Sequence, residues 1–306
     1  MKKTLLTVAL IAACIIAEAQ KPEMARLLVH YKFTWARDTT SRYPYTENMV
    51  LYVGKSASAY RSYDGVVYRA QFKKAYAKAA AKSVDGRVGI DRIDVGSQTE
   101  YYQYPNERKL LTKDQILVNK YVIEGPLPVI EWKIVGDTAT FGGLHCQKAT
   151  CHFKGRDYTA WFCPDLPVHT GPWKLNGLPG LIVDARDAKN EVVFQFNGVE
   201  KAVPALKNRG PVVPEKDQPP IIRDLDDDMN VIASPPRTIK ATQKEFNKLN
   251  YIWHKDPQAF AQATMESLQA GLPGAEPAKF DHIKLRPNHL FNGPVINNPM
   301  ELPEKK

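Results

Sequence analysis

Beyond its first twenty residues, the 306-residue sequence has no apolar run long enough to span a membrane. A spanning helix needs about 20 predominantly apolar residues. Catalytic and nucleotide-binding patterns are also missing: neither G-x-S-x-G nor H-E-x-x-H occurs, and Gly54-Lys55-Ser56 lacks the leading glycine of a phosphate loop. The sequence therefore predicts no catalytic residue, no metal site and no cofactor.

The first twenty residues have the pattern of a secretory signal peptide. A lysine pair at 2–3 precedes an apolar run, and the A-E-A stretch at 17–19 is a small-polar-small cleavage site. We expect residues 1–19 to be removed and the mature chain to be exported, to the periplasm or to the outer membrane. In an alternative interpretation 11–14 is a lipobox and Cys14 becomes the lipidated first residue, which would make the signal unusually short.

The composition is that of a folded and basic chain. Hydrophobic residues make up 43% and charged residues 25% of the sequence, as in globular domains. Loss of the signal removes two lysines and one glutamate, so the formal charge falls from +9 to +8. This charge favours acidic envelope surfaces and polyanions as neighbours. No recognisable nucleic-acid module accompanies it, so we expect no nucleic-acid partner.

Alternating apolar residues predict a predominantly antiparallel β fold. The alternation is clearest at 27–35 and recurs at 49–53. Short strands joined by Gly, Pro, Asn and Asp favour hairpins over parallel crossovers. Ile130, Trp132 and Ile134 are expected to face inward. Further strands are predicted at 101–104, 119–124, 129–135, 147–153, 158–163, 181–185 and 192–196.

Three helices interrupt or follow these strands. The Ala- and Lys-rich stretch 71–82 predicts a surface helix. Thr242 and Glu245 have the spacing of a capping box, and Asp256 before Pro257 predicts the start of a second carboxy-terminal helix.

These elements predict one α+β domain over residues 20–285. We expect a curved, predominantly antiparallel sheet covered by the carboxy-terminal helices. The proline-rich residues 286–306 predict an extended tail.

Several motifs follow one another between 143 and 184. The order is G-R-D-Y-x-x-W-F from 155, P-D-L-P at 164–167, G-P at 171–172 and G-L-P-G-L-I at 177–182. In these motifs the chain resembles the GLPGLI family. The resemblance implies an exported envelope protein of a Gram-negative bacterium, without established activity, cofactor or catalytic residues. The residues of the family hexapeptide are Gly177, Leu178, Pro179, Gly180, Leu181 and Ile182.

The hexapeptide contains no side chain that could donate a proton, attack an electrophile or bind a metal. Pro179 and Gly180 fit the central positions of a type II turn, in which glycine accepts a positive φ. We therefore predict a structural turn that buries its leucines. The functional alternative is that the turn docks a partner.

Three cysteines remain after signal removal. If the hairpin turn pairs 154 with 155, Cys146 lies opposite Cys163, while Cys151 points to the other face of its strand. An oxidising compartment favours one disulfide. Cys146 and Cys163 are the candidate pair.

The sequence favours a non-enzymatic envelope protein. Its leading predicted function is a binding or assembly factor that contacts an outer-membrane protein or an envelope polymer. The alternatives are a periplasmic carrier of an apolar ligand, for which a lined cavity would argue, and an unrecognised envelope hydrolase.

Overall fold

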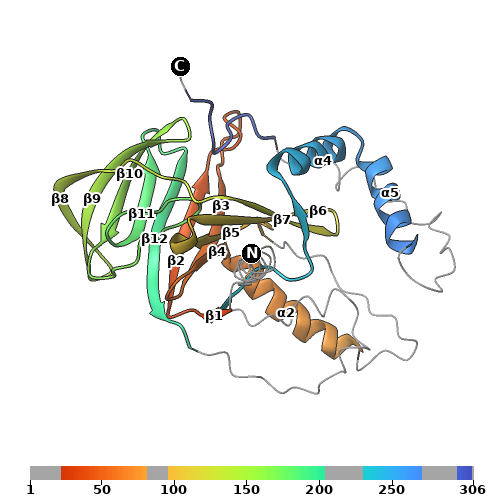
Figure 1. Ribbon diagram of the computed structural model, residues 1–306, viewed down its shortest axis with the longest axis horizontal. Helices are drawn as coiled ribbons and strands as arrows, with labels where there is room; N and C mark the ends of the chain where they lie inside the picture. Colours follow the sequence, from red (N-terminus) through yellow and green to blue (C-terminus); the bar gives the residue numbers. More distant parts are fainter. Residues whose placement is uncertain (1–21, 81–95, 204–229, 271–294, 305–306) are drawn as a thin grey trace, which may run out of the picture.

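The computed structural model describes residues 22–80, 96–203, 230–270 and 295–304 (Figure 1). The predicted signal peptide at 1–19 and the first part of the predicted tail, residues 286–294, lie outside the described residues. In the described part of the chain, no helix combines the length and the apolar character needed to cross a membrane.

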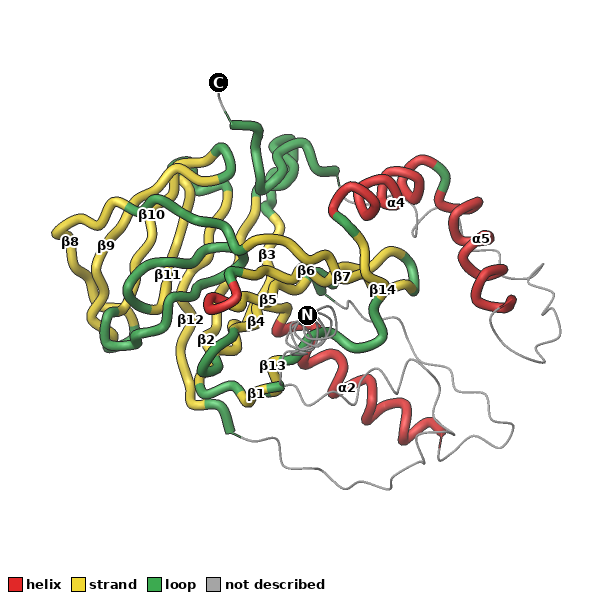
Figure 2. The backbone as a smooth tube through the Cα atoms, in the orientation of Figure 1, coloured by secondary structure: helices red, strands yellow, loops and turns green. Residues whose placement is uncertain are grey.

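Twelve strands form one mostly antiparallel sheet (Figure 2). The strands of the chain are β1 Glu23–Met24, β2 Leu27–Trp35, β3 Tyr45–Val53, β4 Ser58–Ser62, β5 Glu100–Tyr104, β6 Lys109–Ile116, β7 Asn119–Pro126, β8 Lys133–Phe141, β9 Leu144–Phe153, β10 Arg156–Cys163, β11 Leu181–Asp187, β12 Val192–Lys201, β13 Val231–Ile232 and β14 Ile239–Ala241. Their order in the sheet is β14-β7-β6-β5-β4-β3-β2-β12-β11-β10-β9-β8, and β1 pairs with β13 separately. Only β14 and β7 run parallel among these pairs. The predicted mostly β, antiparallel fold is confirmed.

The hairpin of β9 and β10 has the register that the sequence predicts. Phe153 pairs with Arg156, and the ladder continues in step to Gln147 opposite Phe162. The turn therefore lies at Lys154 and Gly155, as the alternation on both strands required.

The predicted strand at 129–135 is wrong in position. The strand begins only at Lys133, and Ile134, which was expected to face inward, is 44% exposed. Ile130 and Trp132 are partly buried against the main core, as expected. Before the strand, Trp132 donates its Nε1 hydrogen bond to the Asn176 carbonyl at 2.8 Å. The alternating apolar residues therefore lie mostly in the segment before β8, which the Trp132 hydrogen bond holds in place. Strand β8 follows at the edge of the sheet, with one face in solvent.

Strand β4 gives no alternating signal, because all five of its residues are buried. It leads directly into helix α2, Tyr63–Ala80, which begins eight residues before the predicted start at 71. The Ser62 hydroxyl accepts a hydrogen bond from the Gly65 N–H at 2.9 Å, and Asp64 accepts one from the Asn48 N–H at 2.9 Å. These bonds fix the change from strand to helix.

The carboxy-terminal helices begin where the sequence predicts. Helix α4, Gln243–Lys255, has the full capping box of Thr242 and Glu245, and α5, Pro257–Ala270, starts after Asp256. A short 3-10 helix, η2, occupies Pro105–Glu107. Phe246 of α4 packs on Tyr121 of β7 with ring centroids 5.7 Å apart. Helix α4 thus packs beside β6 and β7, and α5 packs on α4; that the two helices cover the sheet stays a prediction.

A buried ion pair joins β5 and β6 on one face of the sheet. Lys113 donates to Glu100 at 2.5 Å, and both side chains are largely buried. Burial raises the pKa of Glu100, but the positive charges of Lys113 and Arg61 outweigh burial and hold that pKa at about 2. The carboxylate therefore stays ionised inside the protein.

We expect the Glu100 carboxylate to make the free energy of unfolding depend on pH under acidic conditions. A carboxyl whose pKa is lowered by folding stabilises the fold above its unfolded pKa and stops doing so as the pH falls through its folded value. The stability difference between the wild type and Glu100→Gln should therefore shrink as the pH falls from 5 towards 2. Urea unfolding at stepped pH measures it. Glu107→Gln, at an exposed carboxylate, is the control, and an equal pH dependence in both variants would contradict the assignment.

Candidate functional site

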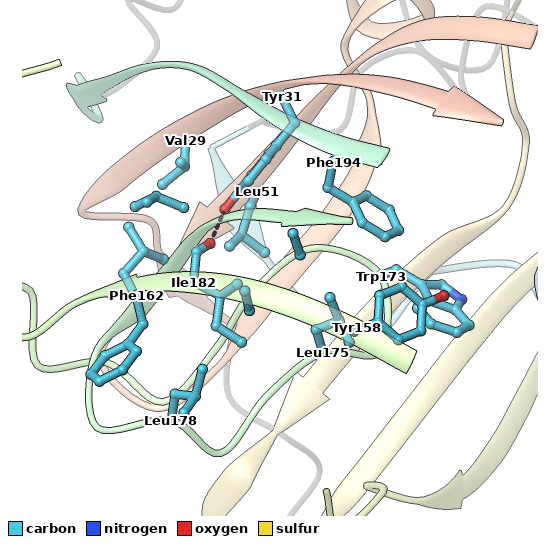
Figure 3. Close-up of a cluster of buried hydrophobic side chains, with 14 of the residues drawn as sticks. Val29, Tyr31, Leu51, Tyr158, Phe162, Trp173, Leu175, Leu178, Ile182 and Phe194 are labelled. Atoms are coloured by element: carbon cyan, nitrogen blue, oxygen red, sulfur yellow. Dashed lines mark hydrogen bonds between the residues drawn. The ribbon is translucent and has the colours of Figure 1, made fainter. Parts of the chain in front are cut away.

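The loop at 164–180 leaves β10 and folds over a sheet face before returning as β11. Its side chains Trp173, Leu175 and Leu178 are fully buried. In Figure 3 Trp173 lies close to Tyr158 and Phe194, which come from the sheet, while Leu178 lies at the other end of the cluster. The Trp173 and Phe194 rings are stacked with centroids 6.3 Å apart. The loop therefore completes the main apolar core.

The hexapeptide buries its leucines as predicted but forms a different turn. The Gly180 N–H donates to the Leu178 carbonyl at 2.8 Å, whereas the Leu181 N–H donates to Leu166 at 2.9 Å. This is a three-residue turn around Pro179. The positive φ predicted for Gly180 is wrong: in the hexapeptide Gly177 has it, at 92°. The type II prediction failed because Leu181 bonds back across the loop, a contact that a local pattern does not reveal.

Position 180 requires glycine because the backbone of Cys163 lies too close for a side chain. A Cβ atom at this position would lie 2.3 Å from the Cys163 carbonyl oxygen and 2.6 Å from its carbon. Both are backbone atoms of the strand that the loop has just left. A side chain at 180 would push the end of the loop away from β10.

Gln103 of β5 holds the loop from the other side. Its Nε2 lies within hydrogen-bonding distance of the carbonyls of Gly171, Trp173 and Leu175, at 3.4, 3.1 and 3.2 Å. Its Oε1 accepts from the Thr170 hydroxyl at 2.9 Å. One buried amide thus satisfies carbonyls that would otherwise be costly to bury. No sequence pattern predicts this role, because Gln103 and its partners lie far apart in the chain.

A strap at 295–304 returns to the same region. In it the Leu302 N–H donates to the Lys154 carbonyl at 3.0 Å, and a Cβ on Gly155 would lie 2.7 Å from the Leu302 carbonyl oxygen. Trp35 of β2 donates to the Asn298 carbonyl at 2.9 Å. This part of the predicted tail has no regular secondary structure, yet it is docked on the sheet.

Arg156 is the centre of the strap contacts. Its guanidinium donates to the carbonyls of Met300 and Pro299 and to the Asn298 side chain at 3.0, 2.8 and 2.6 Å. It also pairs with the carboxylates of Asp187 at 2.6 Å and Glu191 at 2.9 Å. Gly155 and Arg156 of the G-R-D-Y motif therefore contact the carboxy-terminal strap. The motif alone did not predict that this strap would pack against it.

The group beside the strap with the clearest potential for chemistry is His152. Its Nδ1 lies 2.6 Å from Asp157, and its Nε2 lies 2.9 Å from Glu304 of the strap. These two hydrogen bonds raise the pKa of His152. The neighbouring hollow has a volume of about 420 Å³ and is lined by Glu131, Lys133, Thr150, Cys151, His152, Asp157, Tyr158, Thr159 and Ala188.

This hollow lacks the arrangement of a nucleophile and its base. Both ring nitrogens of His152 are engaged by carboxylates, so neither is left to activate a hydroxyl. Burial raises the pKa of the Cys151 thiol to about 12, and a thiol, unlike a thiolate, is a poor nucleophile. In the residues that the structure describes, no cluster of three His, Cys, Asp or Glu side chains could hold a metal ion.

The segment that matches a known family includes the 164–180 loop and the G-R-D-Y motif that contacts the strap. Residues 151–184 match a family model described as a protein of unknown function (Porph_ging), which is the GLPGLI family. The predicted resemblance is confirmed over this segment. No curated protein matches the chain in sequence.

Two solved structures of PNGF-II are similar to this chain. The structure in space group P21 has a TM-score of 0.42 at 13% identity and covers 60% of this chain. The structure in space group C2 has a TM-score of 0.45 at 10% identity and covers 73%. The matches span 30% and 32% of the PNGF-II chains, so this chain corresponds to about a third of their length.

The contact beneath the GLPGLI turn gives a direct test. Gly180→Ala should lower the free energy of unfolding by about 2–3 kcal/mol, since overpacking against backbone forces the loop to shift. Gly136→Ala on β8 is the matched control, because a Cβ there meets nothing within 4 Å, and it should change stability by no more than about 0.5 kcal/mol. Urea unfolding of both variants compares them, and equal stabilities would refute the close-approach argument.

The strap gives a second test. Arg156→Met leaves Asp187 buried without its cation, which should cost about 3–5 kcal/mol. Hydrogen exchange of the strap amides, Leu302 above all, should accelerate more than exchange in β2. Lys148→Met removes a partly exposed ion pair with Asp137 and should cost about 1 kcal/mol or less. Unchanged strap exchange in Arg156→Met would show that Arg156 does not hold the strap.

Proposed function

We propose that the protein is an exported cell-envelope protein that works without catalysis, as a binding or assembly factor for an outer-membrane protein. Export is supported by the signal-peptide pattern at 1–19. Binding rather than catalysis is supported by the family-matched segment, whose distinctive residues serve packing and hydrogen bonding. The binding surface is the free edge of the sheet at β8.

The observation that carries the proposal is the geometry of β8. This strand ends the twelve-stranded order and pairs with β9 on one side, while no described strand lies on its other side. Its register shifts between Ile134 and Thr138, after which Thr138–Phe141 pairs regularly. Such an edge presents unpaired N–H and C=O groups to an incoming extended chain.

The opposite edge of the sheet is protected. Strand β14 has three residues and is followed at once by the Thr242 cap of α4. Short edge strands discourage pairing with another chain. By contrast, Val129 just before β8 and Ile134 within it expose apolar side chains. The occupant that fits this edge is an extended segment with alternating apolar side chains, as in the strands of an outer-membrane protein.

The carrier alternative is disfavoured by how the sheet and loop pack. Strands β5 and β10 are six positions apart in the sheet order, or roughly 29 Å along a flat sheet. Yet the Trp173 carbonyl lies 3.1 Å from Gln103 of β5, while its ring lies 6.4 Å from the Tyr158 ring of β10. This supports a sheet curved around the loop, and the loop's own buried side chains occupy the concave side where an apolar ligand would lie.

The hydrolase alternative has less support than binding. It would need a nucleophile beside a free base, and His152 has carboxylates on both ring nitrogens. An activity screen becomes informative if the edge test below fails.

A photo-crosslinking amino acid at Thr140 tests the docking edge. In intact cells we expect an adduct with an outer-membrane protein, because a strand paired with β8 would lie beside this residue. Introducing Thr138→Lys in the same chain should reduce the adduct roughly fivefold or more, since an edge lysine opposes strand addition.

The matched control places the crosslinker at Tyr251, an exposed residue of α4. It should give no adduct with the same protein. Equal adducts from Thr140 and Tyr251, or an adduct at Thr140 that is insensitive to Thr138→Lys, would overturn β8 as the docking edge.

A further inference from the structure

Two thiols lie opposite each other next to the docking edge. The β9–β10 ladder pairs Trp161 with Lys148 and Phe162 with Gln147. Continued by one step in the same register, this ladder would place Cys163 opposite Cys146. Cys146 is in turn paired with Ala139 of β8. Directly opposed residues have Cβ atoms about 4.5–5.5 Å apart, close to the roughly 3.5–4.5 Å of a disulfide.

The two side chains are buried together. The exposed fractions of Cys146 and Cys163 are 2% and 0%. Burial raises the pKa of Cys146 to about 12, and a side-chain hydrogen bond with Cys163 adds to the rise. The thiols are therefore neighbours in a site that strongly disfavours the thiolate.

We propose that Cys146 and Cys163 form a cross-strand disulfide while the chain folds, and that Cys151 stays a thiol. The two thiols form one S–S bond and give up two electrons and two protons. A protein or glutathione disulfide accepts them and becomes two thiols. The inference rests on the proposed export, because an oxidising compartment supplies such a disulfide.

Burial determines when the bond forms. Exchange requires a thiolate that an oxidant can reach, and the folded protein provides neither at Cys146. The pair must therefore be oxidised before the β9–β10 hairpin is covered. A protein folded in the reduced state should resist oxidation afterwards.

Cys151 is separated from the pair by the geometry of the strand. It lies opposite Tyr158 in the ladder and is an odd number of residues from Cys146. Its side chain therefore points to the other face of β9. Cys151 therefore serves as an internal control, because a disulfide that forms selectively between Cys146 and Cys163 should leave it a thiol.

The disulfide would stiffen two features at once. Cys163 also supplies the carbonyl beneath Gly180, where the GLPGLI loop rejoins the sheet. Cys146 backs Ala139, within the regular part of β8 that we propose as the docking edge. One bond would thus fix the loop and the strands behind that edge.

The test is refolding of the purified mature chain in a glutathione redox buffer, followed by alkylation under denaturing conditions and peptide mass mapping. We expect a Cys146–Cys163 linked peptide, two hydrogens lighter than the reduced pair, and alkylated Cys151. Chain folded first in reductant and then given glutathione disulfide should gain the link at least tenfold more slowly. A link that includes Cys151, three alkylated thiols, or equal rates in the two orders would overturn the proposal.

Melting temperatures give a second readout. Reductant present during refolding should lower the Tm of the wild type by about 5–10 °C, and it should leave Cys146→Ser/Cys163→Ser unchanged. Cys151→Ser should keep the sensitivity to reductant. A double variant that responds like the wild type would refute the link.

The same peptide mapping, on protein alkylated inside cells, tests the disulfide and the proposed export independently. A chain that begins at Gln20 and carries the link supports both. A chain that forms the link in vitro, but in cells keeps residues 1–19 and all four thiols, that of Cys14 included, refutes export alone. A cleaved, exported chain with three thiols refutes the disulfide alone.

Discussion

The packing of the 164–180 loop against the sheet is the constraint on which the rest of the structure depends. On one side the Gln103 side-chain amide lies within hydrogen-bonding distance of three loop carbonyls, and on the other Trp173 lies against Phe194 and Tyr158. The loop can make both contacts only if strands distant in the sheet order approach it together. A buried amide and a buried indole thereby couple parts of the sheet that share no backbone ladder.

The strap extends this coupling to the end of the chain. Arg156 uses its guanidinium donors for two carboxylates and for strap residues more than a hundred positions away. Because an arginine at 3% exposure is costly without partners, the strap is part of the folded unit and not an appendage. Lys174 of the loop pairs with Glu301 of the strap, so the loop and strap stabilise each other.

Local features of the fold could be predicted from sequence, and long-range ones could not. The capping box at Thr242 and the β9–β10 register follow from spacing over a few residues, and both were confirmed. Strand β4 was missed because a strand buried on both faces does not alternate. Gly180 was assigned the wrong reason, since its constraint is the Cys163 carbonyl rather than its own φ. Gln103 acts only through residues brought close by folding.

The family-matched segment at 151–184 therefore explains architecture better than activity. Its glycines, Arg156 and buried leucines each have a packing or hydrogen-bonding cause, which accounts for their pattern without any ligand. The proposed docking edge, β8, precedes this segment in the chain. A scaffold of this kind can keep its loop and strap while the side chains of one edge strand change. Partner choice would then be set by exposed residues of β8 such as Thr138 and Ile134.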